Sequence, residues 1–335
     1  MRWLIPITLV FLMVALGSSR VLATFCDGKL YQITSTGAAG ARVTQLFRIR
    51  LDTQSYELVG SDNTGNPVNA FAYNPDDGLI YGILFNQPNS RLVSFDSSGN
   101  FTDRGIIGGN FDLFSVAGTF VYDTAAAEYR LHVRYGSTRS IAVIDVQSNT
   151  RVSTYSLSGD AGTNTGTNSW SDMAFNPIDG RIYALANLKK QLYSWDPDGV
   201  TAGQSTTIPT DRSSGAGAQF FDSTGTFYGA ENTTGEVFTI DLATGVSTVV
   251  GKSATASGND GANCFTQPTQ IDYDYSDAAN TYGVAQHTAT PTLLRLGPTV
   301  TSETSATQVV SRIFRTFDFV RGLRGLVSSG QAVVQ

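Results

Sequence analysis

Carboxylates are the main groups in this sequence that could do acid–base chemistry. Five aspartates recur at spacings of 44, 49, 51 and 45 residues, each where an apolar stretch meets a turn: Asp52, Asp96, Asp145, Asp196 and Asp241. A pair of carboxylates is the machinery of glycoside hydrolysis. Aspartates that recur in register before a turn, however, accept backbone N–H groups there. We therefore interpret these five as turn residues, because a catalytic pair should break the repeat.

Asp172 comes closest to breaking the repeat. It begins an apolar stretch at a position where Ala70, Thr119 and Ala218 stand in the other copies. The sequence offers this acid no evident carboxylate partner, so it does not predict a glycosidase pair. We expect no catalytic residue and no enzyme activity.

The sequence lacks the residue patterns of metal binding, nucleophilic catalysis and nucleotide binding. His132 alternates with apolar neighbours and is interpreted as a packed histidine, and His287 has no clustered cysteines or acids that would complete a zinc site. No nucleophile elbow, phosphate loop or dinucleotide glycine pattern occurs. We expect neither a metal nor a cofactor.

A repeated unit organises the chain. An apolar strand runs into Asn or Asp, a turn follows, and the next strand centres on tyrosine, as in residues 71–82 and 173–184. The Asp-Gly turns flanked by β-rich runs indicate hairpins. Four strands in a unit of 44–51 residues are typical of a propeller blade. The sequence predicts an all-β fold, a β-propeller of five four-stranded blades, with five or six blades as the open alternatives.

The first unit lacks its first strand, and the end of the chain can supply it. Cys26 opens the first unit directly at its turn, and residues 261–263 just before Cys264 would provide the missing strand. Pairing the two ends in one blade removes the exposed edges of a linear stack. The two cysteines would then lie on either side of one turn, so we expect a Cys26–Cys264 disulfide; two free buried thiols are the alternative.

The first residues are typical of a secretory signal peptide. Arg2 precedes an apolar run over residues 3–16, and small residues lead to a cleavage site after Ala23. The run is too short to span a membrane, which needs about 20 residues. We expect a secreted or cell-surface monomer with no membrane span after cleavage. The net charge of −6 without a basic stripe argues against nucleic acid as a partner.

The stretch from Cys26-Asp27-Gly28-Lys29-Leu30-Tyr31-Gln32 to Asn259-Asp260-Gly261-Ala262-Asn263-Cys264 resembles a domain-of-unknown-function family of propeller-like repeats. That family occurs near the start of exported, often adhesin-like surface proteins. Residues 274–283 are similar to the Asp-Tyr-Gly-Asp-Ala-Pro segment that follows in those proteins, although Ser276 and Ala279 depart from it. The resemblance implies a surface role and no particular chemistry.

These observations divide the chain into four parts. Residues 1–23 form the signal peptide, 24–266 the propeller, 267–300 a surface-protein-type extension, and 301–335 a basic tail, either disordered or a short helix. Four residues are candidates for a binding face on the propeller loops: Trp170, Asp172, Asn187 and Asn69. Trp170 has a competing interpretation as a packing residue between blades. Asn100 and Asn232 begin sequons and are candidate N-glycosylation sites.

Together these features predict a non-catalytic extracellular or cell-surface module that presents its loops to a glycan or to a surface or matrix protein. The alternative is an extracellular carbohydrate-active enzyme, a glycoside hydrolase or lyase with carboxylates at the mouth of the propeller. The two hypotheses differ in whether acids that break the repeat converge at the axis within about 5 to 10 Å.

Overall fold

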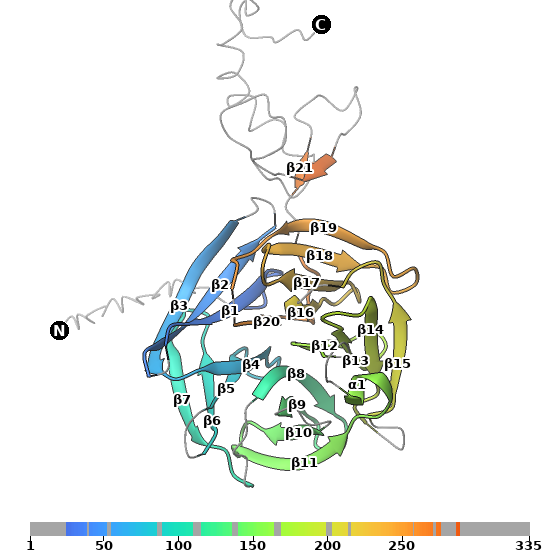
Figure 1. Ribbon diagram of the computed structural model, residues 1–335. Coiled ribbons are helices and arrows are strands. Elements are labelled where there is room, and N and C mark those ends of the chain that lie inside the picture. Colours follow the sequence, from blue (N-terminus) through green and yellow to red (C-terminus); the bar gives the residue numbers. More distant parts are fainter. Residues whose placement is uncertain are drawn as a thin grey trace, which may run out of the picture.

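The computed structural model describes residues 25–38, 40–51, 55–85, 89–109, 115–135, 140–163, 169–198, 203–213, 216–256, 258–270, 273–275 and 286–288. Within them, five four-stranded antiparallel sheets surround a common axis (Figure 1). This confirms the predicted five-bladed propeller. The predictions for residues 1–23, for Asp52 and for residues 301–335 lie outside the described residues.

The strands of each blade follow one another from the axis outward, except that blade 1 takes its innermost strand from the far end of the chain. From the axis outward, blade 1 contains β20 (Asn259–Asn263), β1 (Leu30–Thr36), β2 (Arg42–Arg50) and β3 (Ser55–Gly65). Blade 2 contains β4 (Val68–Tyr73), β5 (Ile80–Leu84), β6 (Arg91–Phe95) and β7 (Phe101–Ile106). Blade 3 contains β8 (Ser115–Asp123), β9 (Glu128–Tyr135), β10 (Ser140–Asp145) and β11 (Thr150–Ser156).

The remaining blades follow the same order. Blade 4 contains β12 (Ala174–Asn176), β13 (Arg181–Leu185), β14 (Gln191–Trp195) and β15 (Ser205–Pro209). Blade 5 contains β16 (Ala216–Phe221), β17 (Phe227–Glu231), β18 (Glu236–Ile240) and β19 (Ser247–Lys252). A short helix, α1 (Gly159–Thr163), lies between blades 3 and 4, and the strands β21 (Tyr273–Tyr275) and β22 (Gln286–Thr288) pair with each other.

Ring closure follows the predicted arrangement. Strand β20 pairs antiparallel with β1, with Leu30 opposite Asn263. Just beyond this pair, Cys26 and Cys264 form a disulfide, with their Cα atoms 4.8 Å apart. The disulfide prediction is confirmed, and the two ends of the propeller meet in one blade with no open inner edge.

A shared side-chain contact explains the repeat of aspartate, glycine and tyrosine. In three blades the turn from the innermost to the second strand contains an Asp-Gly pair, and the tyrosine four residues after the aspartate donates its hydroxyl to the aspartate Oδ2. The pairs are Tyr31–Asp27 at 2.9 Å, Tyr81–Asp77 at 2.6 Å and Tyr183–Asp179 at 2.5 Å. The glycines have φ of 71–74°, which other residues rarely adopt.

The core lies between neighbouring blades. Strands near the axis are buried on both faces, as in β5, whereas the outermost strand β7 is largely exposed. Large fully buried side chains such as Trp195, Phe95 and Phe220 fill the spaces between the sheets. Burying one such side chain contributes about 1.5–3 kcal/mol, so the packing between neighbouring blades stabilises the ring.

The two faces of the ring carry different connections. The loop face carries the loops that leave each blade and those between its two middle strands, among them residues 157–163, 169–171, 186–190 and 231–235. The turn face carries the tight turns on the other side, among them residues 74–79, 96–100, 145–149 and 241–246. The innermost strands run from the loop face to the turn face.

The segment after the disulfide packs onto the turn face. The Gln267 carbonyl accepts the Ser223 N–H at 3.1 Å, and the Gln270 N–H donates to the Gly28 carbonyl at 2.7 Å. Residues 267–270 therefore lie against the propeller, although the sequence placed the boundary at residue 266. A short extension is tied to blades 1 and 5 by these backbone bonds.

Candidate functional site

The repeating aspartates set turns. In each of the four that the structure describes, Oδ1 accepts the backbone N–H two residues on, at 2.8–3.0 Å: Asp96, Asp145, Asp196 and Asp241. The N–H groups of Ala243 and Thr244 lower the pKa of Asp241. The turn interpretation is confirmed for these four, and Asp52 lies outside the described residues.

Two acids that break the repeat meet at the axis. Asp172 precedes β12 in blade 4, Asp260 lies in β20 of blade 1, and their side chains form a hydrogen bond. The two residues are 0% and 1% exposed. The sequence left Asp172 without a partner, and the structure corrects this: Asp260 is its partner.

Asp172 joins blade 4 to blade 5. Its Oδ1 accepts the Met173 N–H at 2.7 Å, and its Oδ2 accepts the Gln219 N–H of β16 at 2.6 Å. A second hydrogen bond joins the same two blades: Gln219 Oε1 accepts the Leu185 N–H of β13 at 2.9 Å. Both oxygens of Asp172 thus satisfy buried backbone donors that would otherwise lack a partner.

Asp260 joins blade 1 to blade 2. Its Oδ1 accepts the Gly261 N–H at 2.8 Å, and its Oδ2 accepts the Phe71 N–H of β4 at 2.6 Å. Ala70 has a φ of 58°, a left-handed conformation that is costly for a residue with a Cβ. The carboxyl of Asp260 stabilises this bulge by accepting the Phe71 N–H next to Ala70.

The environment favours the neutral form of these acids. Burial, and then the charge of the neighbouring Asp260, raise the pKa of Asp172 well above its ordinary value. Burial raises the pKa of Asp260 to about 7, although hydrogen bonds from Phe71 N–H and from Asp172 oppose the rise. Burial and the contact between the two acids therefore favour a neutral carboxyl over a second negative charge.

A buried guanidinium lies next to the pair. Arg134 of β9 is 6% exposed, and its Cζ lies 4.1 Å from the centre of the Trp170 ring. Burial lowers the pKa of Arg134 to about 10, and the charge of Asp172 opposes that change. Its Nε and Nη1 have no hydrogen-bond partner among the residues that the structure describes. Arg134 therefore supplies a buried positive charge that acts on Asp172.

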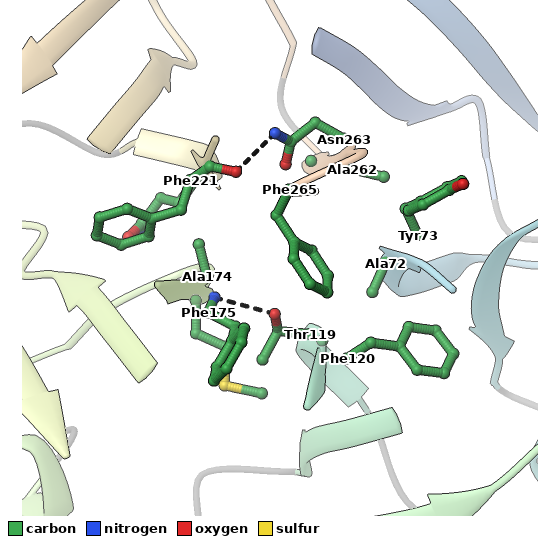
Figure 2. Close-up of a pocket in the computed structure, with 14 residues that line it drawn as sticks. Ala72, Tyr73, Thr119, Phe120, Ala174, Phe175, Phe221, Ala262, Asn263 and Phe265 are labelled. Atoms are coloured by element: carbon green, nitrogen blue, oxygen red, sulfur yellow. Dashed lines mark hydrogen bonds between the residues drawn. The ribbon is translucent and has the colours of Figure 1, made fainter. Parts of the chain in front are cut away.

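The axis is closed on the turn-face side of the acids. A small cavity there is lined by residues of all five innermost strands and by Phe265. Phe265 points into the middle of the ring, and its ring lies 5.6 Å from that of Phe175 (Figure 2). The Tyr129 ring lies 5.7 Å from Phe265. The cavity offers about 20 Å³ to the centres of water molecules, room for about one.

The pairing register of the innermost strands could have identified Asp260 as the partner of Asp172. Asn263 lies opposite Leu30 in blade 1 as Phe175 lies opposite Ile182 in blade 4. Counting back three residues from each places Asp260 and Asp172 at the same level of the ring. From the sequence we assigned residues 261–263 to the closing strand. We did not extend that strand to Asp260, the residue directly before it.

Two of the four predicted binding-face residues are buried. Trp170 is 1% exposed, its ring packs on Trp195 at 5.6 Å, and its Nε1 donates to the Ala161 carbonyl at 3.2 Å. The competing interpretation of Trp170 as a residue packed between blades describes this environment. Asp172 is fully buried, so neither side chain lies at the surface of the ring.

Asn187 and Asn69 are partly exposed near the loop face. Asn187 Oδ1 accepts the Ser171 hydroxyl at 3.1 Å, and its backbone N–H donates to the Ser169 carbonyl at 2.7 Å. Asn69 stands directly before the bulge at Ala70. Their part in binding stays a prediction.

The structure tests the interpretation of His132 and gives only the strand pairing of His287. His132 is 4% exposed and its Nδ1 lies 3.2 Å from the Tyr155 hydroxyl. Burial lowers the pKa of His132 to about 3, so it is a neutral, packed histidine as predicted. His287 lies in β22 opposite Asp274.

The two sequons differ in their surroundings, and we expect Asn100 alone to carry a glycan when the protein is secreted from a glycosylating host. Asn100 is exposed in a turn. Asn232 Oδ1 accepts the Asn259 amide at 2.9 Å, and its side chain packs on the Cα of Gly217. Peptide mapping before and after enzymatic deglycosylation measures the occupancy of each site; a fully occupied Asn232 would contradict this expectation.

The part of the chain that the structure describes contains no group of three or more His, Cys, Asp or Glu side chains that could hold a metal ion. No helix there is long and apolar enough to cross a membrane.

A family model described as a repeat of unknown function, DUF6923, matches residues 32–266. The chain belongs to this family. The match spans the blades of the propeller from β1 to the end of the ring at Phe265 and Thr266. None of the curated proteins compared with the chain matches it.

Solved structures resemble the chain at low identity. TolB from Acinetobacter baumannii is 14% identical with a TM-score of 0.43, and the alignment covers 71% of this chain and 56% of that one. A Bacteroides thetaiotaomicron protein of unknown function is 14% identical with a TM-score of 0.44, covering 73% and 64%. A chain of a nidogen/laminin complex is 10% identical with a TM-score of 0.40, and the alignment covers 70% of this chain and 100% of that one. The chain thus spans less than two thirds of the first two proteins.

Proposed function

We propose that this member of the DUF6923 family is a non-catalytic extracellular or cell-surface module that acts as a monomer and presents its loop face to a glycan or to a surface or matrix protein. The state of the axial acids carries the proposal. All four of their carboxyl oxygens accept backbone N–H groups, and both residues are buried. Acids used in this way hold strands together and have no free oxygen for a substrate.

The surroundings of the acids also favour a structural role. A glycosidase needs a sugar ring between its two carboxyl groups, which stand about 5–5.5 Å apart or more. Here the two acids bond directly to each other, and the cavity beside them has room for about one water. The disulfide supports an extracellular setting, and so does the occurrence of the resembled family in exported surface proteins.

The loop face supplies neutral hydrogen-bonding groups near the axis. Ser171 and Asn187 form one hydrogen-bonded pair there, and Asn232 and Asn259 form another. Amides and hydroxyls of this kind donate to and accept from sugar hydroxyls and peptide groups. Leu188, 65% exposed between Asn187 and Lys189, adds an apolar contact on the same loop.

The test is binding of the secreted protein to arrays of immobilised oligosaccharides and matrix glycoproteins. We expect the double substitution Asn187→Ala and Leu188→Ala to weaken binding about tenfold, the loss of roughly one good contact. Asn100→Ala on the turn face is the matched control and should leave binding unchanged. Equal loss in both variants, or no binding to any array, would contradict the proposal.

The carbohydrate-active enzyme remains the second candidate because two acids that break the repeat do converge at the axis. The same oligosaccharides, incubated with the protein, report on it through release of reducing ends or of unsaturated products. Turnover that Asp172→Asn abolishes would establish the enzyme and overturn the non-catalytic proposal.

A further inference from the structure

The hydrogen bond between Asp172 and Asp260 requires a proton. Two carboxylates have only acceptors, so a direct bond between them forms when one of them is protonated. Two negative charges in contact in a buried site would repel strongly. The contact therefore defines a pair that carries one proton and one negative charge.

Neighbouring groups match this charge state. The oxygens of the pair face the N–H donors of Met173, Gln219, Phe71 and Gly261, so they are already surrounded by donors. Arg134, which keeps its charge at any ordinary pH, provides one positive charge beside Asp172. One shared proton makes this buried group electrically neutral as a whole.

We propose that Asp172 and Asp260 hold one proton between them at neutral pH, and that this proton-bridged pair helps to hold the ring closed. We call the pair the latch. Asp260 belongs to β20, the strand that closes the ring, and it also binds β4. Asp172 binds β16. The pair thus ties together the innermost ends of blades 1, 2, 4 and 5.

The latch is sensitive to pH in one direction. At the level of the pair the other innermost strands present Ala70, Thr119 and Ala218, which are uncharged. Among the described residues, the ionisable groups that act on the pair are therefore the two acids on each other and Arg134 on Asp172. Burial raises the pKa of both acids, so their contribution to stability is complete below the pKa of an unfolded aspartate, about 3.9. It is lost as the pH rises through the folded pKa, and the latch loosens in alkali.

Infrared spectroscopy of the intact, oxidised protein measures the proton directly. We expect the C=O stretch of a protonated carboxylic acid at pH 7, its loss as the pH is raised, and its absence at pH 7 from Asp172→Asn and Asp260→Asn. Arg134→Met should move the loss at least one pH unit upward, because it removes the neighbouring positive charge. A wild-type spectrum without the band at pH 7 would overturn the proposal whether or not the variants fold.

Hydrogen exchange measures whether the latch holds the strands at the closure of the ring together. After correction for the intrinsic effect of pH, amides of β20 and β4 should exchange at least tenfold faster at pH 9 than at pH 6, while those of β10 change little. The protein with Asp172→Asn should show no such difference between the two pH values. Equal pH dependence in β20 and β10 would show that the pair does not act on ring closure.

Discussion

Loss of the Cys26–Cys264 bond is expected to lower the free energy of unfolding by about 5 kcal/mol, since the bond closes nearly the whole propeller into one loop. The two cysteines are 238 residues apart in sequence. Closing a loop of that length removes much of the conformational freedom of the unfolded chain. Urea denaturation of the oxidised and the reduced protein, followed by tryptophan fluorescence, measures the difference.

A variant with both cysteines replaced by alanine is the control for this prediction. It should unfold at the same urea concentration as the reduced wild-type protein and should not respond to reductant. If reduction leaves the midpoint of the wild type unchanged, the pairing of β20 with β1 holds the ring closed without help from the disulfide.

Asp172→Ala is expected to destabilise the protein by about 3–5 kcal/mol, because it leaves buried partners unpaired. The Gln219 N–H would lose its acceptor, and Asp260 would keep a buried carboxyl without its neighbour. Asp172→Asn should cost only about 1–2 kcal/mol, because its amide can donate to Asp260 as the shared proton does, and only one of the two backbone N–H groups bound by Asp172 loses its acceptor. Thermal and urea denaturation of the three proteins at pH 6 measures the series.

Thr119→Ala is the matched control for that series. Thr119 lies at the same level of the ring in blade 3, and its hydroxyl accepts the Phe175 N–H at 3.1 Å. Its loss should cost about 1 kcal/mol, the value of one ordinary hydrogen bond. If Asp172→Ala costs no more than Thr119→Ala, the axial acids contribute no more than a single neutral bond.

Local features of the sequence predicted the fold because each blade carries its own signal. The recurring aspartates, the Asp-Gly turns and the tyrosine four residues after each such aspartate are fixed by contacts within one hairpin. Strands without exposed residues, such as β5, then lie near the axis, and strands with exposed polar residues, such as β7, lie outside. Even ring closure was predictable, because the first unit visibly lacked a strand and both cysteines flanked the gap.

The candidate site depended on contacts between blades, which no local pattern records. Trp170 was placed correctly in a loop, but Arg134 from the preceding blade covers its ring and buries it. Asp260 was overlooked as the partner of Asp172 because the two are far apart in the chain and come together only when the ring closes. A register carried through all five innermost strands would have found the level that they share.

The disulfide also decides how the ring bears mechanical load. The chain enters the propeller at Cys26 and leaves it at Cys264, with Cα atoms 4.8 Å apart on the turn face. A pull between the segments on either side is carried by one covalent bond, so the five sheets between them stay unstretched. The loop face lies on the opposite side of the ring, so its shape is independent of tension along the chain.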